Sequence, residues 1–210
     1  MQWLKNIIGI KPKKMLGIDI SHHNGVIDWK RVKADPQGIQ FCYIKATQGV
    51  DFTDPKFIAN VQGCKAAGLK WGAYHYATWN NHNVTADAKF EAAHFLSKVK
   101  MLGEPDMPLV LDAESNEKPV LSPQELLTFI TIFLGEIEKA GYKPVLYSYP
   151  GWINSYLPKN HGLGKYPLWL ADYTEPLNKV NGWTSPWLHQ YTEKGKVNGI
   201  TTNVDMNKII

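Results

Sequence analysis

Apolar and polar positions alternate along the chain with two different periods. Short runs rich in β-branched and aromatic residues predict strands at 16–20, 40–46, 69–76, 109–111 and 143–148. Longer amphipathic stretches predict helices at 29–34, 55–67, 85–100, 122–140 and 152–156. Strands that alternate with helices in this way indicate βαβ units and a parallel sheet.

Two of the predicted helices carry further signals. Ser122 and Glu125 have the spacing of a capping box at the start of the fourth helix, where each side chain bonds the backbone of the other. Phe90, Ala93 and Leu96 recur along the third helix, so we expect them to form its buried face.

The pattern changes in the last third of the chain. Further strands are predicted at 168–171, 188–191 and 204–207, and no long helix lies between them. We therefore expect an α/β protein, a single irregular β/α barrel (TIM-barrel-like) of about eight strands with few helices in its C-terminal third. A chain of 210 residues fits one domain. We place that domain at 15–210, after an N-terminal extension at 1–14.

Composition excludes several classes of protein. The net charge is +4, but no Lys/Arg block is dense enough for a nucleic-acid arm, so we expect no nucleic-acid partner. No stretch approaches the ~18 apolar residues of a membrane span. Residues 1–14 lack the features of a secretory signal, so phage-type release or non-classical export is expected. Cys42 and Cys64 make no disulfide framework and are expected to be buried thiols.

Polar residues gather at the predicted strand ends, where parallel β/α barrels carry their active sites. Asp112 and Glu114 lie two residues apart at the end of the fourth strand, so both carboxyl groups face the same side. Crowding and partial burial raise the pKa of each group. One can then stay protonated while the other stays ionised, as cleavage of a glycosidic bond requires. The alternative, a pair of surface acids, is disfavoured by the apolar run before them.

Two further acids belong to the first and last predicted strands. Asp19 and Asp205 are expected to meet, because these strands are neighbours in a closed barrel. Crowded acids indicate a functional site or a metal site. His22 and His23 have no second cluster at zinc spacing, so we expect hydrogen-bonding roles for them, and neither a metal nor another cofactor.

Short sequence stretches carry a resemblance to a known family. They are GIDISHHNG (17–25), YIKATQG (43–49), GAYHYA (72–77), PLVLDAES (108–115), VLYSY (145–149), LWLADY (168–173), HQYT (189–192) and VDMN (204–207). In this order they resemble the family 25 glycoside hydrolases, the muramidases that include the Chalaropsis-type lysozyme and many phage lysins. They cover nearly the whole chain, from residue 17 to residue 207.

The resemblance implies a lysozyme, which hydrolyses the β-1,4 bond between N-acetylmuramic acid and N-acetylglucosamine in peptidoglycan with retention of configuration. Glu114 matches the general acid/base and Asp112 its stabilising carboxylate, while Asp19 and Asp205 match the other two acids of the site. The residues expected to contact the sugar are Tyr76, Tyr147, Trp169, Tyr173, Lys45 and Gln190. We expect a monomer that acts on the bacterial cell wall, in wall degradation or bacteriolysis.

The sequence leaves the route of catalysis open. Either a carboxylate attacks the anomeric carbon, or the N-acetyl carbonyl of the substrate does so while Asp112 orients it. Direct attack needs carboxyl groups ~5–5.5 Å apart, whereas alternate residues on a strand lie roughly 6.5–7 Å apart, which favours the N-acetyl route. One departure from the family pattern is Gln48, an amide where an acid is common, which removes a charge near the cleft.

Two other functions compete with this interpretation. A chitinase-type barrel also uses an Asp-x-Glu strand end, but it does not account for all the matching stretches. A non-catalytic wall-binding module would be expected to have lost at least one of the four acids, and all four are present.

Overall fold

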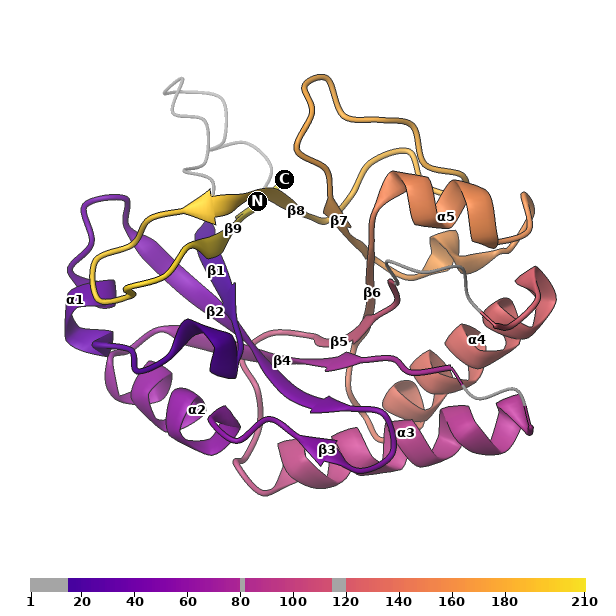
Figure 1. The fold of residues 1–210 in the computed structure, drawn as a ribbon, viewed down its shortest axis with the longest axis horizontal. Coiled ribbons are helices and arrows are strands. Elements are labelled where there is room, and N and C mark those ends of the chain that lie inside the picture. Colours follow the sequence, from indigo (N-terminus) through magenta and orange to yellow (C-terminus); the bar gives the residue numbers. More distant parts are fainter. Residues whose placement is uncertain (1–14, 80–81, 115–119) are drawn as a thin grey trace, which may run out of the picture.

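The chain forms a closed β-barrel in a computed structural model that describes residues 15–79, 82–114 and 120–210 (Figure 1). The strands of the barrel are β1 (Leu16–Ile20), β2 (Ile39–Gln48), β4 (Lys70–Tyr76), β5 (Leu109–Asp112), β6 (Pro144–Ser148), β7 (Leu168–Ala171), β8 (Leu188–Gly195) and β9 (Val204–Ile209). A short strand that the sequence did not reveal, β3 (Phe52–Thr53), pairs with the end of β2. The predicted fold class, a single irregular β/α barrel, is confirmed.

The direction of the last strand decides which residues share a mouth of the barrel. Each strand from β1 to β8 in the barrel runs parallel to its neighbour, whereas β9 runs antiparallel to both β8 and β1. The first residues of β9 therefore lie beside the carboxyl end of β1. Asp205 reaches the same mouth as Asp19 for this reason, although it stands at the start of its strand rather than the end.

Helices cover the outer face of the first part of the barrel. They are α1 (Trp29–Lys33), α2 (Phe57–Ala66), α3 (Val84–Lys100), α4 (Pro123–Lys139) and α5 (Pro150–Tyr156), with short 3-10 helices η1 (His22–Asn24) and η2 (Leu163–Lys165). Figure 1 shows α2, α3 and α4 along one side of the barrel. Among the described residues, no helix occurs after η2, in agreement with the predicted helix-poor end.

The helix signals of the sequence had different outcomes. The capping box of Ser122 and Glu125 is present at the start of α4. The predicted buried face of α3 is wrong, because Phe90 is 65% exposed and Ala93 is also exposed, while Leu96 alone of the three is buried. The face that meets the sheet includes the charged residue Glu91, so apolar spacing alone pointed to the wrong side.

Two apolar clusters support the barrel. One lies between the sheet and the helices, and the other fills the barrel interior with Phe41, Tyr43, Met107, Val110, Val145, Tyr147, Trp169, Ala171 and Leu188. Gly72 makes room for this interior packing, since a Cβ there would lie 2.4 Å from a ring carbon of Tyr43. The filled interior leaves polar side chains to gather at one mouth.

Two predictions from composition can be compared with the described residues. No helix among them is long and apolar enough to cross a bilayer. Cys42 and Cys64 are buried and free, as predicted.

Candidate active site

A hollow of about 140 Å³ opens at the mouth where the carboxyl ends of the parallel strands meet. We call it the acidic hollow. It is lined by Asp19, Ser21, His23, Lys45, Tyr74, Tyr76, Asp112, Glu114, Tyr147, Trp169 and Asp205. The structure therefore brings together all four acids that the sequence singled out.

Asp112 and Glu114 stand at different depths in this hollow. Asp112 is the last residue of β5 and is 7% exposed, and its Oδ1 atom is buried without a hydrogen-bond partner among the described residues. Burial, and then the charge of Glu114, raise the pKa of Asp112 well above its ordinary value. Burial and the charge of Asp205 raise the pKa of Glu114, while Lys45 lowers the pKa of both groups.

The sequence analysis gave the proton of this pair to Glu114. In the structure, burial raises the pKa of both groups, and Asp112 is the more deeply buried of the two. Asp112 belongs to the strand, whereas Glu114 follows the strand end towards the mouth and is only partly buried. A hydrogen bond donated to Asp112 would lower its pKa and favour the proton on Glu114.

Asp19 and Asp205 are direct partners across β1 and β9, so their predicted meeting is confirmed. Oδ2 of Asp19 accepts hydrogen bonds from Nδ2 of Asn207 at 2.7 Å and from Nε2 of Gln190 at 3.0 Å. Burial raises the pKa of Asp19 to about 6. Burial and the charge of Asp19 raise the pKa of Asp205 to about 8. Both carboxyl groups of this second pair therefore keep their protons to higher pH than an isolated aspartate does.

The aromatic residues of the site are fixed by contacts with each other and with amides. The ring of Trp169 lies 4.9 Å from that of Tyr147, and its Nε1 donates to Oδ1 of Asn207 at 2.8 Å. Oε1 of Gln190 accepts hydrogen bonds from the hydroxyl groups of Tyr147 and Tyr173, at 3.2 and 2.8 Å. These bonds hold the wall of the hollow in one arrangement.

Two predicted site residues do not line the acidic hollow. Gln190 is 2% exposed and lies behind the wall, where it binds Asp19 and two tyrosines. Tyr173 is 51% exposed. Asn207, which the sequence analysis did not single out, makes the shorter bond to Asp19. Its position two residues after Asp205, on the same face of a strand, was a signal that could have identified it.

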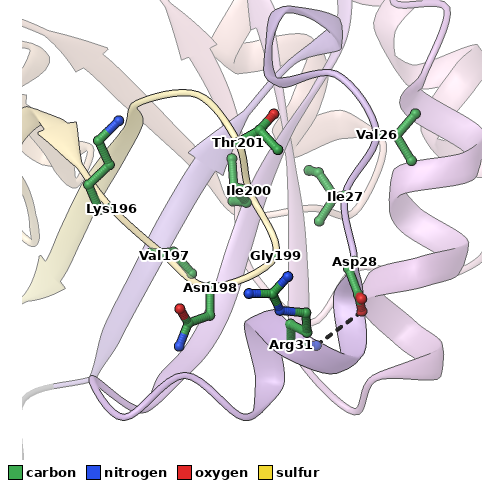
Figure 2. Close-up of a pocket in the computed structure, with 10 residues that line it drawn as sticks. All are labelled: Val26, Ile27, Asp28, Arg31, Lys196, Val197, Asn198, Gly199, Ile200 and Thr201. Atoms are coloured by element: carbon green, nitrogen blue, oxygen red, sulfur yellow. Dashed lines mark hydrogen bonds between the residues drawn. The ribbon is translucent and has the colours of Figure 1, made fainter.

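A larger hollow of about 570 Å³ lies elsewhere, between the start of α1 and the loop joining β8 to β9 (Figure 2). Its charged residues are Asp28, Arg31 and Lys196. Asp28 caps α1 by accepting a hydrogen bond from the backbone of Arg31 at 3.1 Å. Because this hollow contains no pair of crowded carboxyl groups, the smaller acidic hollow is the better candidate for acid/base chemistry.

Of the two histidines near the site, His22 makes a side-chain contact with an acid, since its Nδ1 lies 2.8 Å from Oδ2 of Asp54. The rings of His22 and His23 have centroids 3.9 Å apart and planes tilted by 38°, and the backbone N–H of His23 donates a hydrogen bond to Oγ of Ser21 at 3.3 Å. Within the described ranges, no group of three or more His, Cys, Asp or Glu residues is placed to hold a metal ion.

Comparison with known proteins agrees with this geometry. Residues 18–200 match the family described as Glycosyl hydrolases family 25. The chain belongs to this family. As a family 25 glycoside hydrolase, it is 38% identical over 197 residues to the uncharacterized protein YegX of Escherichia coli O157:H7, a match that covers 91% of this chain and 68% of that protein.

Two other relatives of this family 25 glycoside hydrolase have informative names. Lysozyme M1 of Streptomyces globisporus is 33% identical over 199 residues, which cover 91% of this chain and 66% of that one. The crystal structure of the bacterial lysozyme from Streptomyces coelicolor superposes with a TM-score of 0.79 at 29% identity, covering 95% of this chain and 93% of that one. The family resemblance noted from the sequence is confirmed, and the chain is a glycoside hydrolase.

Proposed function

We propose that this glycoside hydrolase is a muramidase that cleaves the β-1,4 bond between N-acetylmuramic acid and N-acetylglucosamine in bacterial peptidoglycan. The observation that carries the proposal is the burial of Asp112 and Glu114 together in one hollow beside Asp19 and Asp205. The names of the relatives, among them lysozymes and an N,O-diacetylmuramidase of Chalaropsis, support the choice of substrate.

Glu114 is the proposed general acid and base. It lies nearer the mouth than Asp112, where a glycosidic oxygen can reach it, and its raised pKa keeps the proton available. It protonates the departing oxygen in the first step. In the second step it takes a proton from the water that attacks the anomeric carbon, so the acid form is restored.

Asp112 is the proposed partner of the substrate's N-acetyl group. In the first step the acetyl oxygen bonds to the anomeric carbon as the glycosidic bond breaks, and positive charge spreads over the resulting ring. Oδ1 of Asp112 has no hydrogen-bond partner among the described residues, so it can accept the acetamido N–H. That bond lowers the pKa of Asp112 and leaves the proton of the pair on Glu114. Attack by water from the face of the lost bond then gives retention.

The remaining predicted residues have supporting roles in this proposal. Asp19 and Asp205 complete the acidic wall, and the rings of Tyr76, Tyr147 and Trp169 form the surface for the sugar. Tyr173 stands at a more exposed position and Lys45 contributes the positive charge. Gln190 acts through Asp19 and the tyrosines that it binds.

The proposal is tested by digestion of purified peptidoglycan sacculi, with the released ends identified by mass spectrometry. We expect muramic acid at the new reducing ends, in the retained anomeric form when proton NMR is recorded early in the digest. Reducing-end glucosamine, cleaved stem peptides or equal activity on chitin would exclude a muramidase.

The role of Glu114 is tested by substitution. We expect Glu114→Gln to lower kcat by about 100-fold or more with a small change in KM, because the proton donor is lost while the shape of the site is kept. Glu104→Gln, at an exposed glutamate, is the matched control and should retain the wild-type rate. A Glu114→Gln enzyme that turns over at the wild-type rate would refute the assignment.

We further propose that the enzyme acts on the bacterial wall as a monomer and does not bind nucleic acid. Light scattering across a range of protein concentrations tests the first point. A mass that rises to that of a dimer at working concentrations would contradict it.

A further inference from the structure

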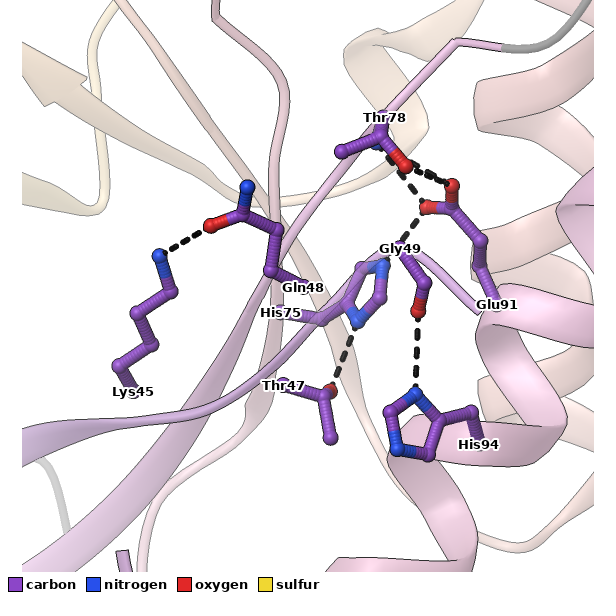
Figure 3. Close-up of polar contacts among 8 residues, drawn as sticks. All are labelled: Lys45, Thr47, Gln48, Gly49, His75, Thr78, Glu91 and His94. Carbon is purple, nitrogen blue, oxygen red and sulfur yellow. Dashed lines mark hydrogen bonds and ion pairs between the residues drawn. The ribbon is translucent and has the colours of Figure 1, made fainter. Parts of the chain in front are cut away.

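Among the described residues, one lysine side chain lines the acidic hollow. Lys45, on β2, is 8% exposed, and its Nζ donates a hydrogen bond to Oε1 of Gln48 at 2.7 Å (Figure 3). The same ammonium group lies 4.8 Å from the ring centroid of Tyr76 and 5.8 Å from that of Phe52. Two rings and a neutral amide therefore hold the positive charge in one place.

An irregularity in β2 brings Lys45 and Gln48 to the same face. Residues three apart on a regular strand face opposite sides. The pairing of β2 with β4 shifts register between Lys45 and Thr47, so one extra residue is accommodated there. Thr47 consequently turns to the outer face, with its Oγ1 2.8 Å from Nδ1 of His75, and Gln48 turns inward beside Lys45.

The outer face of this segment is anchored by a buried polar network. Nε2 of His75 lies 2.8 Å from Oε2 of Glu91 on α3, and Nδ1 of His94 lies 3.0 Å from the carbonyl oxygen of Gly49. Figure 3 shows Lys45 and Gln48 on one side and these contacts on the other. The network fixes the backbone from which Gln48 projects, so the amide is in place before substrate arrives.

The charged groups around Lys45 are mostly acids. Burial lowers the pKa of Lys45 below its ordinary value, and the charges of Asp112, Asp54 and Glu114 partly offset that effect. Asp54 is itself bonded to His22. Asp19, His23, Tyr76 and Asp205 line the same hollow. In the part of the chain that the structure describes, Lys45 forms no ion pair within 4.0 Å, so no carboxylate cancels its charge at close range.

We propose that Gln48 is a positioning residue that holds the ammonium group of Lys45 as an unpaired positive charge facing Asp112 and Glu114, and so sets the pH range of hydrolysis. The consequence for pH rests on the function proposed above for these two acids. A neutral amide orients the lysine without cancelling its charge, whereas a carboxylate at this position would form a close ion pair with it. The unpaired charge lowers the pKa of both acids and counteracts their burial.

The test is the substitution Gln48→Glu, with kcat and KM measured from low to high pH. The new carboxylate neutralises Lys45, so the pKa values of Asp112 and Glu114 rise. We expect both limbs of the profile of kcat/KM to move to higher pH by about one unit, the scale of one added charge at this range. Gln62→Glu, at an exposed position of α2, adds the same charge elsewhere and should leave both limbs in place.

A neutral substitution separates charge from position. Gln48→Met removes the acceptor but adds no charge, so its limbs should move less than those of Gln48→Glu. Limbs that move equally in the two variants, or a Gln48→Glu profile that matches the wild type, would overturn the proposal. A change in KM alone with fixed limbs would also overturn it, because it would make Gln48 a simple substrate contact.

A measurement without substrate keeps this inference separate from the proposed function. Carbon-13 NMR of labelled aspartate and glutamate carboxyl groups gives the titration of Asp112 and Glu114 directly, with Asp112→Asn and Glu114→Gln used to assign the signals. Both groups should titrate at higher pH in Gln48→Glu. If Gln48→Glu leaves both titrations unchanged while the wild-type enzyme cuts sacculi, the inference is wrong. If the titrations shift but the wild-type enzyme does not cut sacculi, the positioning of Lys45 by Gln48 is supported and the muramidase proposal is contradicted.

Discussion

Burial raises the pKa of each of the four acids in the hollow. Asp112, Glu114, Asp19 and Asp205 all have raised pKa values, and burial is the largest cause for each. Raised values in a crowded site are typical of catalysis, and they reduce the stability of the folded chain at high pH. The activity and the stability of this protein should therefore respond to pH through the same residues.

Asp205 provides a test of that link. Folding raises its pKa from 3.8 to about 8, so unfolding releases a proton between these pH values and wild-type stability falls as the pH rises through them. Asp205→Asn has no such proton, so its Tm should exceed that of the wild type by a margin that grows from about pH 4 to pH 8. Thermal unfolding followed by circular dichroism measures the margin. A margin that shrinks over this range would show that the pKa of Asp205 is lowered instead.

The exposed residue Asp51 supplies the control for this experiment. Asp51→Asn should give a difference in Tm that is small and nearly constant with pH. The comparison removes the general effect of deleting one negative charge from a basic protein.

At the residue scale, strand alternation predicted that Asp112 and Glu114 share a side, and the closure of the barrel predicted that Asp19 meets Asp205. These two arguments were sufficient for the acids. They were insufficient for Gln190, which supports the wall from behind, and for Asn207, which was overlooked. The difference in depth between Asp112 and Glu114 was also not predicted, because spacing along a strand does not give it.

At the scale of elements, packing inside the barrel limits what each strand can carry. Gly72 on β4 faces the ring of Tyr43 on β2, and an added Cβ would lie 2.4 Å from Cε1 of that ring. Gly135, in the middle of α4, has nothing within 4 Å of the corresponding position. The same substitution should therefore have opposite effects at the two sites.

We expect Gly72→Ala to lower the free energy of unfolding by about 1–3 kcal/mol, through overpacking of the interior. Gly135→Ala should raise it by roughly 0.5–1 kcal/mol, because alanine loses less backbone entropy in a helix. Urea unfolding of both variants and the wild type measures these changes. A stabilised Gly72→Ala would mean that Tyr43 can move aside at little cost.

The element predictions failed where tertiary contacts overrode local pattern. The capping box of α4 was predicted because both partners lie within four residues. The buried face of α3 was not, since its contact with the sheet runs through Glu91, Thr78 and His75. The short strand β3 exists only because it pairs with the end of β2.

At the scale of the whole molecule, closure of the barrel by β9 is the decisive feature. The backbone N–H of Ile209 on β9 donates a hydrogen bond to the backbone oxygen of Met15 at 3.0 Å, so the pairing of the last strand extends to the residue just before β1. We therefore propose that 15–210 is the folded, catalytic unit.

A chain that starts at Met15 tests this boundary. We expect the same cooperative thermal transition and the same rate on sacculi as the full chain. A chain that ends before Val204, and so lacks β9, should fail to fold cooperatively because β1 and β8 lose their partner. If the chain that starts at Met15 fails to fold, residues 1–14 contribute to the stability of the domain.

The sequence by itself determined the alternation of elements, the position of Asp19, Asp112 and Glu114 at or just after strand ends, and the family, because these depend on spacing and order along the chain. Only the tertiary structure decided that β9 runs antiparallel and carries Asp205 to the mouth, and that the register shift in β2 turns Gln48 towards Lys45. Strand direction and register result from pairing between distant segments. Local pattern therefore did not predict them.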